Sequence, residues 1–347
     1  MTDIVLISLA TTPGLVRSDA AFAQLIRDCG AGCEVVPVKI GPSGKLRRHA
    51  AATDLVEAVA ARRTARKATR NARAVVYSTT TAALLQPTDK PYAVRFDATA
   101  GLNRPSGWPS AWQRSRERHV LKEARLLLPV SGGATAALPE PHAPAVRVPI
   151  PVDDVPAAPE RDITATAYAG YPKKRGLAEI AMAWMNVCPP DGKLVVGGLD
   201  REKANRWYTR IGLLEPAQTE YTGMIPREEW LAKVARSRVF VNASWWEDYG
   251  IAQFEALAAG TPVATVPSPG PYEALPLIRD LDPELVSETV DPQQLGKAIE
   301  KALAYDDAQR ADYGARAQKL LEPYRPEALR ATVADKVLPV LLDEAPR

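Results

Sequence analysis

Two carboxylates eight residues apart, Glu247 and Glu255, are the side chains of this chain whose types and spacing point most directly to chemistry. Glu255 falls one to two turns into a helix that we expect to begin near Gly250 and to end at Gly260. A helix N-terminus offers N–H groups and a positive dipole end to an anion. Carboxylates would repel that anion but accept hydrogen bonds from vicinal hydroxyls. The pattern predicts a nucleotide-sugar site, with a solvated surface helix as the alternative.

The residues around this pair follow a family pattern. The run from Glu247 to Val266 resembles the E-x7-E motif, followed by E-A-x-A-x-G-x-P-V, of the retaining GT-B glycosyltransferases of family 4. The resemblance extends over about half the chain, from Tyr168 to roughly Tyr305. It implies an α/β fold with two Rossmann-like, doubly wound domains facing a cleft. It also implies a C-terminal helix that crosses back to the N-terminal domain.

The resemblance implies roles for residues that match the motif. Glu255 would hold the ribose hydroxyls of the donor nucleotide, and Glu247 would contact the donor sugar near its anomeric carbon. Gly250 and Ile251 would offer backbone N–H groups to the diphosphate. The loop that touches the base matches Gly223, Met224 and Ile225.

The expected diphosphate clamp departs from the family pattern. The family shows Gly-Arg and then Lys-Gly, whereas this chain reads Gly170-Tyr-Pro-Lys-Lys-Arg-Gly176. Tyr171 replaces the expected arginine, and Arg175 takes the lysine position. Lys173, Lys174 and Arg175 can still neutralise a diphosphate, and arginine binds it bidentately. Which of the three does so stays open, as does the alternative of a solvated basic turn.

The N-terminal half matches the family less closely. Its first predicted strand is followed by a single glycine, Gly14, where the family often has two, and we expect Gly14 at the donor site. Asp97 stands where many members carry a histidine, and either orients a hydroxyl of the acceptor or donor or caps the following turn. Trp245 and Trp246 offer either a sugar-stacking platform or domain-interface packing.

Positive charge is concentrated in one segment of the N-terminal half. From Lys45 to Arg73 the chain has nine Lys or Arg and two acidic residues, although its overall net charge is only +3. Four arginines recur at helical spacing and are expected on one face of a helix over Ala50–Arg70 and its flanks: Arg62, Arg66, Arg70 and Arg73. This face predicts an anionic acceptor or peripheral contact with an anionic membrane, against the alternative of a solvated face. Without interleaved aromatic residues, a nucleic acid is not expected.

Short apolar runs alternate with helical stretches in both halves, which predicts parallel doubly wound sheets. The Pro-rich stretch from Leu138 to Pro159 separates them. We therefore expect an acceptor-binding domain over residues 1–150, a donor-binding domain over 151–322 and a returning helix over 323–347. The expected strands of the first domain are Ile4–Leu9, Glu34–Val38, Ala74–Tyr77, Tyr92–Phe96, Leu126–Val130 and Val146–Ile150. Those of the second are Thr164–Ala169, Lys193–Val196, Glu220–Thr222, Val239–Asn242, Pro262–Val266 and Glu284–Val286.

Composition and one further motif bear on the location of the protein and on metal binding. Three cysteines without metal-ligand spacing favour a reducing cytoplasm, and no apolar run is long enough to span a membrane. The pair Asp280 and Asp282 has the D-x-D form of a metal–diphosphate site, but we expect it in a polar loop and assign it no metal.

The prediction is a metal-independent hexosyltransferase without a cofactor. Its substrate would be a UDP- or GDP-sugar, and its acceptor a glycan, a lipid or a small molecule. We expect it in the cytoplasm, with peripheral contact at the inner face of the membrane. Two alternatives stay open: a non-catalytic GT-B subunit that binds nucleotide-sugars, and a GT-B sugar-nucleotide epimerase or hydrolase.

Overall fold

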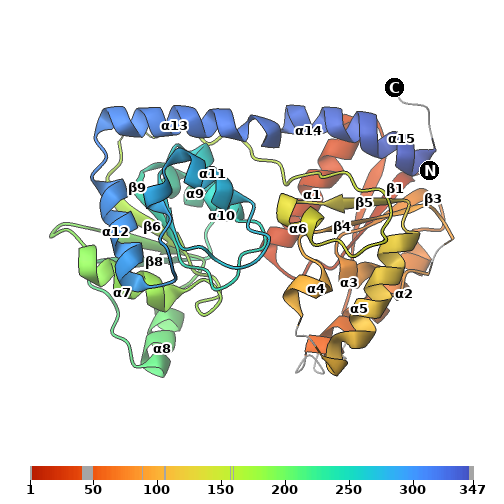
Figure 1. Cartoon of the computed structure of the whole chain (residues 1–347), viewed down its shortest axis with the longest axis horizontal. Coiled ribbons are helices and arrows are strands. Elements are labelled where there is room, and N and C mark those ends of the chain that lie inside the picture. The colour runs from red at the N-terminus through yellow and green to blue at the C-terminus, as the bar shows by residue number, and fades with distance from the viewer. Residues whose placement is uncertain are drawn as a thin grey trace. The chain divides into compact units, whose positions relative to one another are not determined.

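The chain folds into two compact units, each built on a parallel sheet (Figure 1). The computed structural model describes residues 2–40, 50–87, 89–104, 107–156, 158 and 160–343. One unit comprises Met1–Pro151 together with Tyr324–Arg347, and the other comprises Val152–Pro323. Two Rossmann-like α/β units were expected, and this part of the prediction is confirmed.

The first unit has a five-stranded sheet in the order β2-β1-β3-β4-β5. All its strand pairs are parallel, with Ile4 opposite Cys33 on one side and Ala74 on the other. The inner strands β1, β3 and β4 are largely apolar and buried because helices cover both faces of a parallel sheet, whereas the edge strand β2 is partly exposed. Their bounds are β1 (Thr2–Ser8), β2 (Cys33–Pro37), β3 (Ala72–Tyr77), β4 (Tyr92–Phe96) and β5 (Leu126–Pro129).

Helices from both ends of the chain complete this unit. The C-terminal segment consists of α14 (Pro326–Thr332), a π-helical turn (Val333–Val337) and α15 (Leu338–Leu342). The turn widens directly before Pro339, whose ring and missing N–H disturb a regular helix. Val333, Val337 and Leu341 are fully buried in the same core as Ile4 and Phe22. The other helices are α1 (Pro13–Asp28), α2 (Ala50–Ala68), α3 (Thr80–Ala83), α4 (Ala100–Asn103), α5 (Trp108–Glu123) and α6 (Gly132–Ala136).

The second unit has a parallel sheet in the order β10-β9-β6-β7-β8. Its strands are β6 (Ile163–Tyr168), β7 (Leu194–Gly197), β8 (Thr219–Gly223), β9 (Ser237–Asn242) and β10 (Val263–Thr265). Its helices are α7 (Leu177–Val187), α8 (Arg201–Ile211), α9 (Arg227–Ala235), α10 (Ile251–Ala258), α11 (Ala274–Leu281), α12 (Pro292–Leu303) and α13 (Asp307–Leu321).

Two predicted strands are wrong. Val146–Ile150 runs beside β5, and the N–H groups of Val146 and Val148 donate to carbonyl oxygens of that strand. It forms only an isolated bridge at Ala145, in a stretch where prolines at 144, 149 and 151 supply no N–H group. Glu284–Val286 is also not a strand, because Asp282 caps a 3-10 turn over Pro283–Leu285.

The surroundings of the D-x-D pair also differ from the prediction. Asp280 lies inside α11 rather than in a loop. Asp282 ends that helix and accepts a hydrogen bond from the hydroxyl of Tyr305 at 2.5 Å. Helix α11 carries an amphipathic apolar stripe, Leu277, Ile278 and Leu281, which is buried.

Among the described residues, no helix is both long and apolar enough to cross a membrane.

The returning C-terminal segment should be integral to the first unit. Leu341→Ala should cost about 2–5 kcal/mol of unfolding free energy, because it leaves a cavity in a closed core. The neighbouring Val340→Ala is the control, since Val340 is 37% exposed and its change should stay within about 0.5 kcal/mol. Urea unfolding of the full chain checks both. Equal stability of the two variants would contradict the packing described.

Candidate functional site

The second sheet changes its winding direction between β6 and β9. These strands pair with each other, and the chain leaves them in opposite directions, toward β7 and toward β10. In doubly wound sheets, ligands bind outside the carboxyl ends of the strands at such a point. The segments that follow β6 and β9 run over residues 169–176 and 243–250. They hold five of the predicted site residues, Lys173, Lys174, Arg175, Glu247 and Gly250.

The two segments touch through their backbones. Gly176 has a φ of +63°, and a Cβ atom there would lie 1.9 Å from the carbonyl oxygen of Ala243. The N–H of Trp245 donates to the carbonyl oxygen of Lys174 at 2.9 Å. Gly250, with a φ of +96°, is also close-packed, since a Cβ atom would lie 2.8 Å from the ring of Tyr272. Only glycine combines a left-handed conformation with such close approach.

Glu247 and Arg175 form an ion pair at this junction. The carboxylate of Glu247 accepts a hydrogen bond from Arg175 Nη1 and another from Gln253 Nε2 at 3.3 Å. Ser244 Oγ lies 3.2 Å from the same carboxylate oxygen, Oε2. Glu247 is only 4% exposed, and a buried carboxylate is tolerated when it is paired and hydrogen-bonded. The structure thus brings two residues that the sequence analysis singled out separately, Glu247 and Arg175, into direct contact.

A second layer of polar side chains supports the pair. Ser244 Oγ lies 2.7 Å from Asn242 Oδ1, and Asn242 Nδ2 donates to Thr265 Oγ1 at 3.0 Å. The hydroxyl of Tyr272 lies 3.1 Å from Thr265 Oγ1. Burial, and then the charge of Glu247, raise the pKa of Tyr272, so its hydroxyl keeps its proton. These residues connect the ends of β9 and β10 to the loop that carries Tyr272.

Glu255 lies on the helix that follows the loop of Glu247, and it pairs with a different arginine. It is 7% exposed on α10, and its Oε1 accepts from Arg227 Nε at 3.2 Å. Arg227 Nη2 also donates to Asp153 Oδ2 at 3.3 Å. The pKa of Tyr168, at the end of β6, is raised by burial, lowered by Arg175 and raised by Glu255. One member of each arginine–glutamate pair, Arg175 and Glu255, therefore shifts the pKa of this one tyrosine.

The remaining cations of the basic turn are more exposed than Arg175. Lys174 Nζ pairs with Asp248 Oδ2 at 3.1 Å, and Asp248 Oδ1 accepts from Trp246 Nε1 at 2.6 Å. Lys173 is exposed, and Tyr171, the residue at the expected arginine position, is 60% exposed. Arg175 is thus the cation of the turn that contacts Glu247.

Helix α10 begins beside this cluster. Gly250 is its N-cap, without a side-chain cap, and its first turn contains no acidic residue. The N–H of Phe254 makes the first intrahelical bond, to the carbonyl oxygen of Gly250. The N–H groups of the first turn, including that of Ile251, precede this bond, and this arrangement suits an anion.

The predicted base loop lies at the end of β8. Gly223 has a φ of +66°, and its carbonyl oxygen accepts from the N–H of Gly198 at 2.9 Å. Met224 is 69% exposed, whereas Ile225 is half-buried. Two of the predicted residues lie in the first unit: Gly14 is the second residue of α1, and Asp97 is exposed directly after β4.

The predicted arginine face is wrong in its extent. Helix α2 ends at Ala68, so Arg70 lies in the following turn and Arg73 lies in β3. Arg73 pairs with Asp3 at 3.2 Å and donates to the carbonyl oxygen of Leu342, so it joins β1 to α15. Arg62 and Arg66 are the two predicted residues that stay on the helix. The basic residues at positions 45, 47 and 48 lie outside the described part of the chain.

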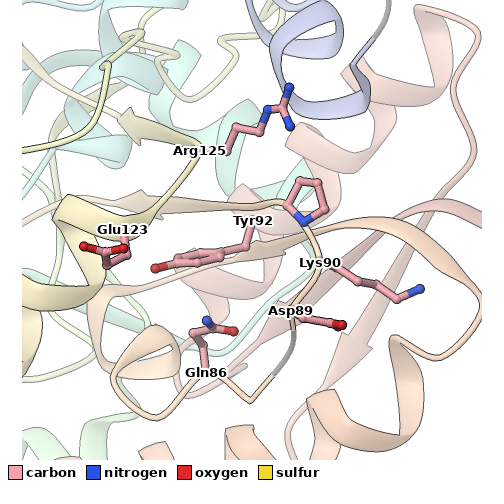
Figure 2. A pocket seen from close by; sticks show the side chains of 7 residues that line it. Gln86, Asp89, Lys90, Tyr92, Glu123 and Arg125 are labelled. Atoms are coloured by element: carbon pink, nitrogen blue, oxygen red, sulfur yellow. The ribbon is translucent and has the colours of Figure 1, made fainter.

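A separate hollow of about 510 Å³ lies in the first unit, next to β4 and β5 (Figure 2). Its wall includes Lys90, Tyr92, Glu123 and Arg125. Tyr92 begins β4 and Arg125 directly precedes β5, so the hollow lies at the amino ends of these strands. It has no place in the nucleotide site, because ligands of doubly wound sheets bind at the carboxyl ends.

Several contacts in this site were not anticipated from the sequence. Asn242 and Ser244 flank the end of β9, and their polarity after an apolar run was an available signal. Gln253 lies between the two glutamates on the buried side of α10. Arg227 gave no signal, because it is far from Glu255 in sequence. Within the described ranges, no cluster of three His, Cys, Asp or Glu residues is placed to hold a metal ion.

Gly176→Ala should disrupt this junction. The added methyl group would collide with the Ala243 carbonyl, and we expect a loss on the order of 3 kcal/mol or more in unfolding free energy. Gly212→Ala is a matched control: its φ is +68°, but no atom lies within 4 Å of its Cβ position. It should cost only the left-handed strain, about 1–2 kcal/mol. Denaturant unfolding compares the two, and similar losses would refute the close approach.

Comparisons with known proteins give a family match for part of the chain and several structures with a similar fold. Residues 153–320 match the family profile described as glycosyl transferases group 1. No curated protein sequence matches the chain. Sucrose-phosphate synthase from Thermosynechococcus elongatus superposes with a TM-score of 0.69 at 17% identity, covering 96% of this chain and 97% of that one.

Two further solved structures show the same fold. Anabaena Alr3699/HepE, in complex with UDP and glucose, has a TM-score of 0.68 at 14% identity, covering 96% of this chain and 98% of that one. The trehalose-6-phosphate synthase OtsA has a TM-score of 0.70 at 11% identity, covering 100% of both chains. At these identities the likeness establishes the fold. Residues 153–320, which lie in the second unit, thus match the glycosyl transferases group 1 family, and the chain has the GT-B fold.

Proposed function

We propose that the chain is a retaining glycosyltransferase of family 4, which moves a hexosyl group from a UDP- or GDP-sugar to an acceptor. The observation that carries the proposal is the ion pair of buried Glu247 with Arg175, at the carboxyl ends of β6 and β9. The carboxylate can accept hydrogen bonds from the donor sugar. The guanidinium can stabilise the charge that develops on a departing diphosphate.

The proposed reaction needs no metal and no cofactor. The bond from the anomeric carbon to the diphosphate oxygen breaks, and a bond to the acceptor oxygen forms on the same face of the sugar. The acceptor's proton passes to the departing diphosphate oxygen. Arg175, Lys174 and Lys173 supply positive charge, and the N–H groups of Gly250 and Ile251 add hydrogen bonds at the start of α10.

The nucleotide is proposed to lie along the carboxyl edge of the second sheet. Glu255 would bind the ribose hydroxyls, and the base would contact Gly223, Met224 and Ile225. The exposed Met224 and the left-handed Gly223 suit a loop that receives a planar group. Gly14 is proposed to contribute to donor binding, and Asp97 to orient a hydroxyl of the acceptor or of the donor.

The acceptor is proposed to be anionic, because the exposed charge of α2 is strongly positive. Arg63, Arg66 and Lys67 are exposed one turn apart on this helix. Its two acidic residues face inward: Asp54 is 1% exposed, and Glu57 is also buried. Asp54 pairs with Arg104 through two hydrogen bonds of 2.8 Å.

A neighbouring helix also carries exposed cations. Helix α5 packs beside α2 and adds the exposed Arg118 and Lys122, together with Trp112, which is 43% exposed. A phospholipid-linked acceptor at the inner face of a membrane would match both the charge and the aromatic residue.

The three cysteines are free thiols, as a cytoplasmic location would require.

The donor site is tested by two carboxylate variants. Wild-type protein should be stabilised by UDP or GDP in a thermal-shift panel, by about 2.7 kcal/mol at 100 times the dissociation constant. Glu255→Gln should weaken nucleotide binding, because an amide is a poorer acceptor for two hydroxyls. Glu247→Gln should leave nucleotide affinity nearly unchanged but lower sugar transfer about 100-fold or more.

The same assays separate the alternatives. Release of free sugar without an acceptor would favour a hydrolase, and conversion of the donor to its epimer would favour an epimerase. Binding without turnover of any donor would favour a non-catalytic subunit. Activity lost in EDTA and restored by Mg²⁺ or Mn²⁺ would contradict the metal-independent reaction.

The basic surface is tested on vesicles. Binding to phosphatidylglycerol vesicles should exceed binding to phosphatidylcholine vesicles and should weaken as salt is added. Replacing Arg63, Arg66 and Lys67 by Gln should weaken the free energy of vesicle binding by up to about 3 kcal/mol, at about 1 kcal/mol per cation. The matched control replaces three exposed cations of α8, Lys203, Arg206 and Arg210, by Gln. If the two triple variants bind vesicles equally, α2 is only a solvated face.

A further inference from the structure

One guanidinium ties together three distant stretches of the second unit. Arg227 is the first residue of α9, Glu255 lies on α10, and Asp153 is the second residue of this unit. Arg227 Nε donates to Glu255 Oε1 at 3.2 Å, and Nη2 donates to Asp153 Oδ2 at 3.3 Å. Its donors are therefore engaged on two sides.

This arrangement restrains a buried carboxylate. The side chain of Glu255 is 9% exposed, whereas that of Arg227 is 37% exposed. Burying a carboxylate without a counter-charge is costly, and an arginine offsets that cost while fixing direction through its planar fork. With Asp153 holding another nitrogen of the fork, rotation of the guanidinium would break one contact or the other. Arg227 therefore limits the orientations that Glu255 can adopt.

Each carboxylate proposed to bind donor hydroxyls has its own arginine. Glu247 pairs with Arg175, and Glu255 pairs with Arg227. Two unpaired carboxylates near a diphosphate would oppose its binding. Arg227 also follows the proposed base loop by only two residues, so the helix that it begins, α9, starts directly after that loop.

We propose that Arg227 is a positioning residue for the ribose subsite. It holds the carboxylate of Glu255 in the orientation that receives the 2′- and 3′-hydroxyls of the nucleotide. The inference rests on the proposed function, in that Glu255 binds ribose. It adds that recognition of the ribose diol depends on a residue outside the glutamate motif. Holding the Glu255 carboxylate in its binding orientation before the nucleotide arrives lowers the entropy cost of ordering this side chain on binding.

The test measures ribose discrimination rather than affinity alone. Calorimetry with UDP and 2′-deoxy-UDP, and with GDP and 2′-deoxy-GDP, gives the ratio of deoxy to ribo dissociation constants. For wild-type protein this ratio should be about 10 or more, as expected for losing a hydrogen bond to a charged group. In Arg227→Met it should fall below about 3, with the deoxynucleotide affinity little changed. Arg227→Lys should recover part of the ratio, because it restores the charge without the fork.

Arg201→Met is the matched control. Arg201 is likewise the first residue of a helix, α8, and pairs with a glutamate, Glu215, at 3.2 Å. Its replacement should leave the ratio unchanged. A ratio in Arg227→Met equal to that of the wild type overturns the inference, even if both nucleotides bind more weakly. Failure of wild-type protein to bind any nucleoside diphosphate overturns the proposed function, and this inference with it.

Discussion

The close contact between the segments after β6 and β9 is the constraint on which the site depends. Parallel strands that are neighbours in a sheet end at the same edge, so the segments that leave them must share a small space. Gly176 resolves this crowding, because it lacks the Cβ atom that would collide with the Ala243 carbonyl. The basic turn is thereby held against the loop of Glu247. The Arg175–Glu247 pair follows from this backbone contact.

Electrostatics then organises the site around paired charges. Glu247 and Glu255 are both nearly inaccessible to solvent, and each is matched by an arginine from a separate segment. Such pairs are weak evidence for stability, because desolvation cancels much of the Coulomb attraction. Their value here is geometric, since they fix where hydrogen-bond acceptors lie. Uncapped N–H groups at the start of α10 lie next to these acceptors in the chain.

The first unit shows how burial changes the meaning of a charge count. The acidic residues of α2 are inside, where Asp54 forms a bidentate pair with Arg104. Its basic residues at 63, 66 and 67 remain exposed. The exposed surface of α2 is therefore more positively charged than a count of all its acidic and basic residues suggests. Helix α5, which packs beside α2, has two glutamates: Glu117 accepts hydrogen bonds from the buried N–H of Ala100, whereas Glu123 is exposed.

The sequence alone determined the parallel sheets and the positions of Glu247 and Glu255. Apolar runs and glycine stops are local features that depend on neighbouring residues in the chain. It failed where a local signal was incomplete: Val146–Ile150 is apolar enough for a strand, but nearby prolines limit its pairing. The helical spacing of Arg70 and Arg73 likewise could not reveal that α2 ends at Ala68.

Only the tertiary structure decided which partners meet. Arg175 of the basic turn contacts Glu247 although 72 residues separate them, and Arg227 contacts Glu255 across 28. Pairing over such distances depends on strand order, and many orders are compatible with the same local patterns. Sequence periodicity fixes the face on which a side chain lies, whereas the packing of whole elements fixes what lies opposite it.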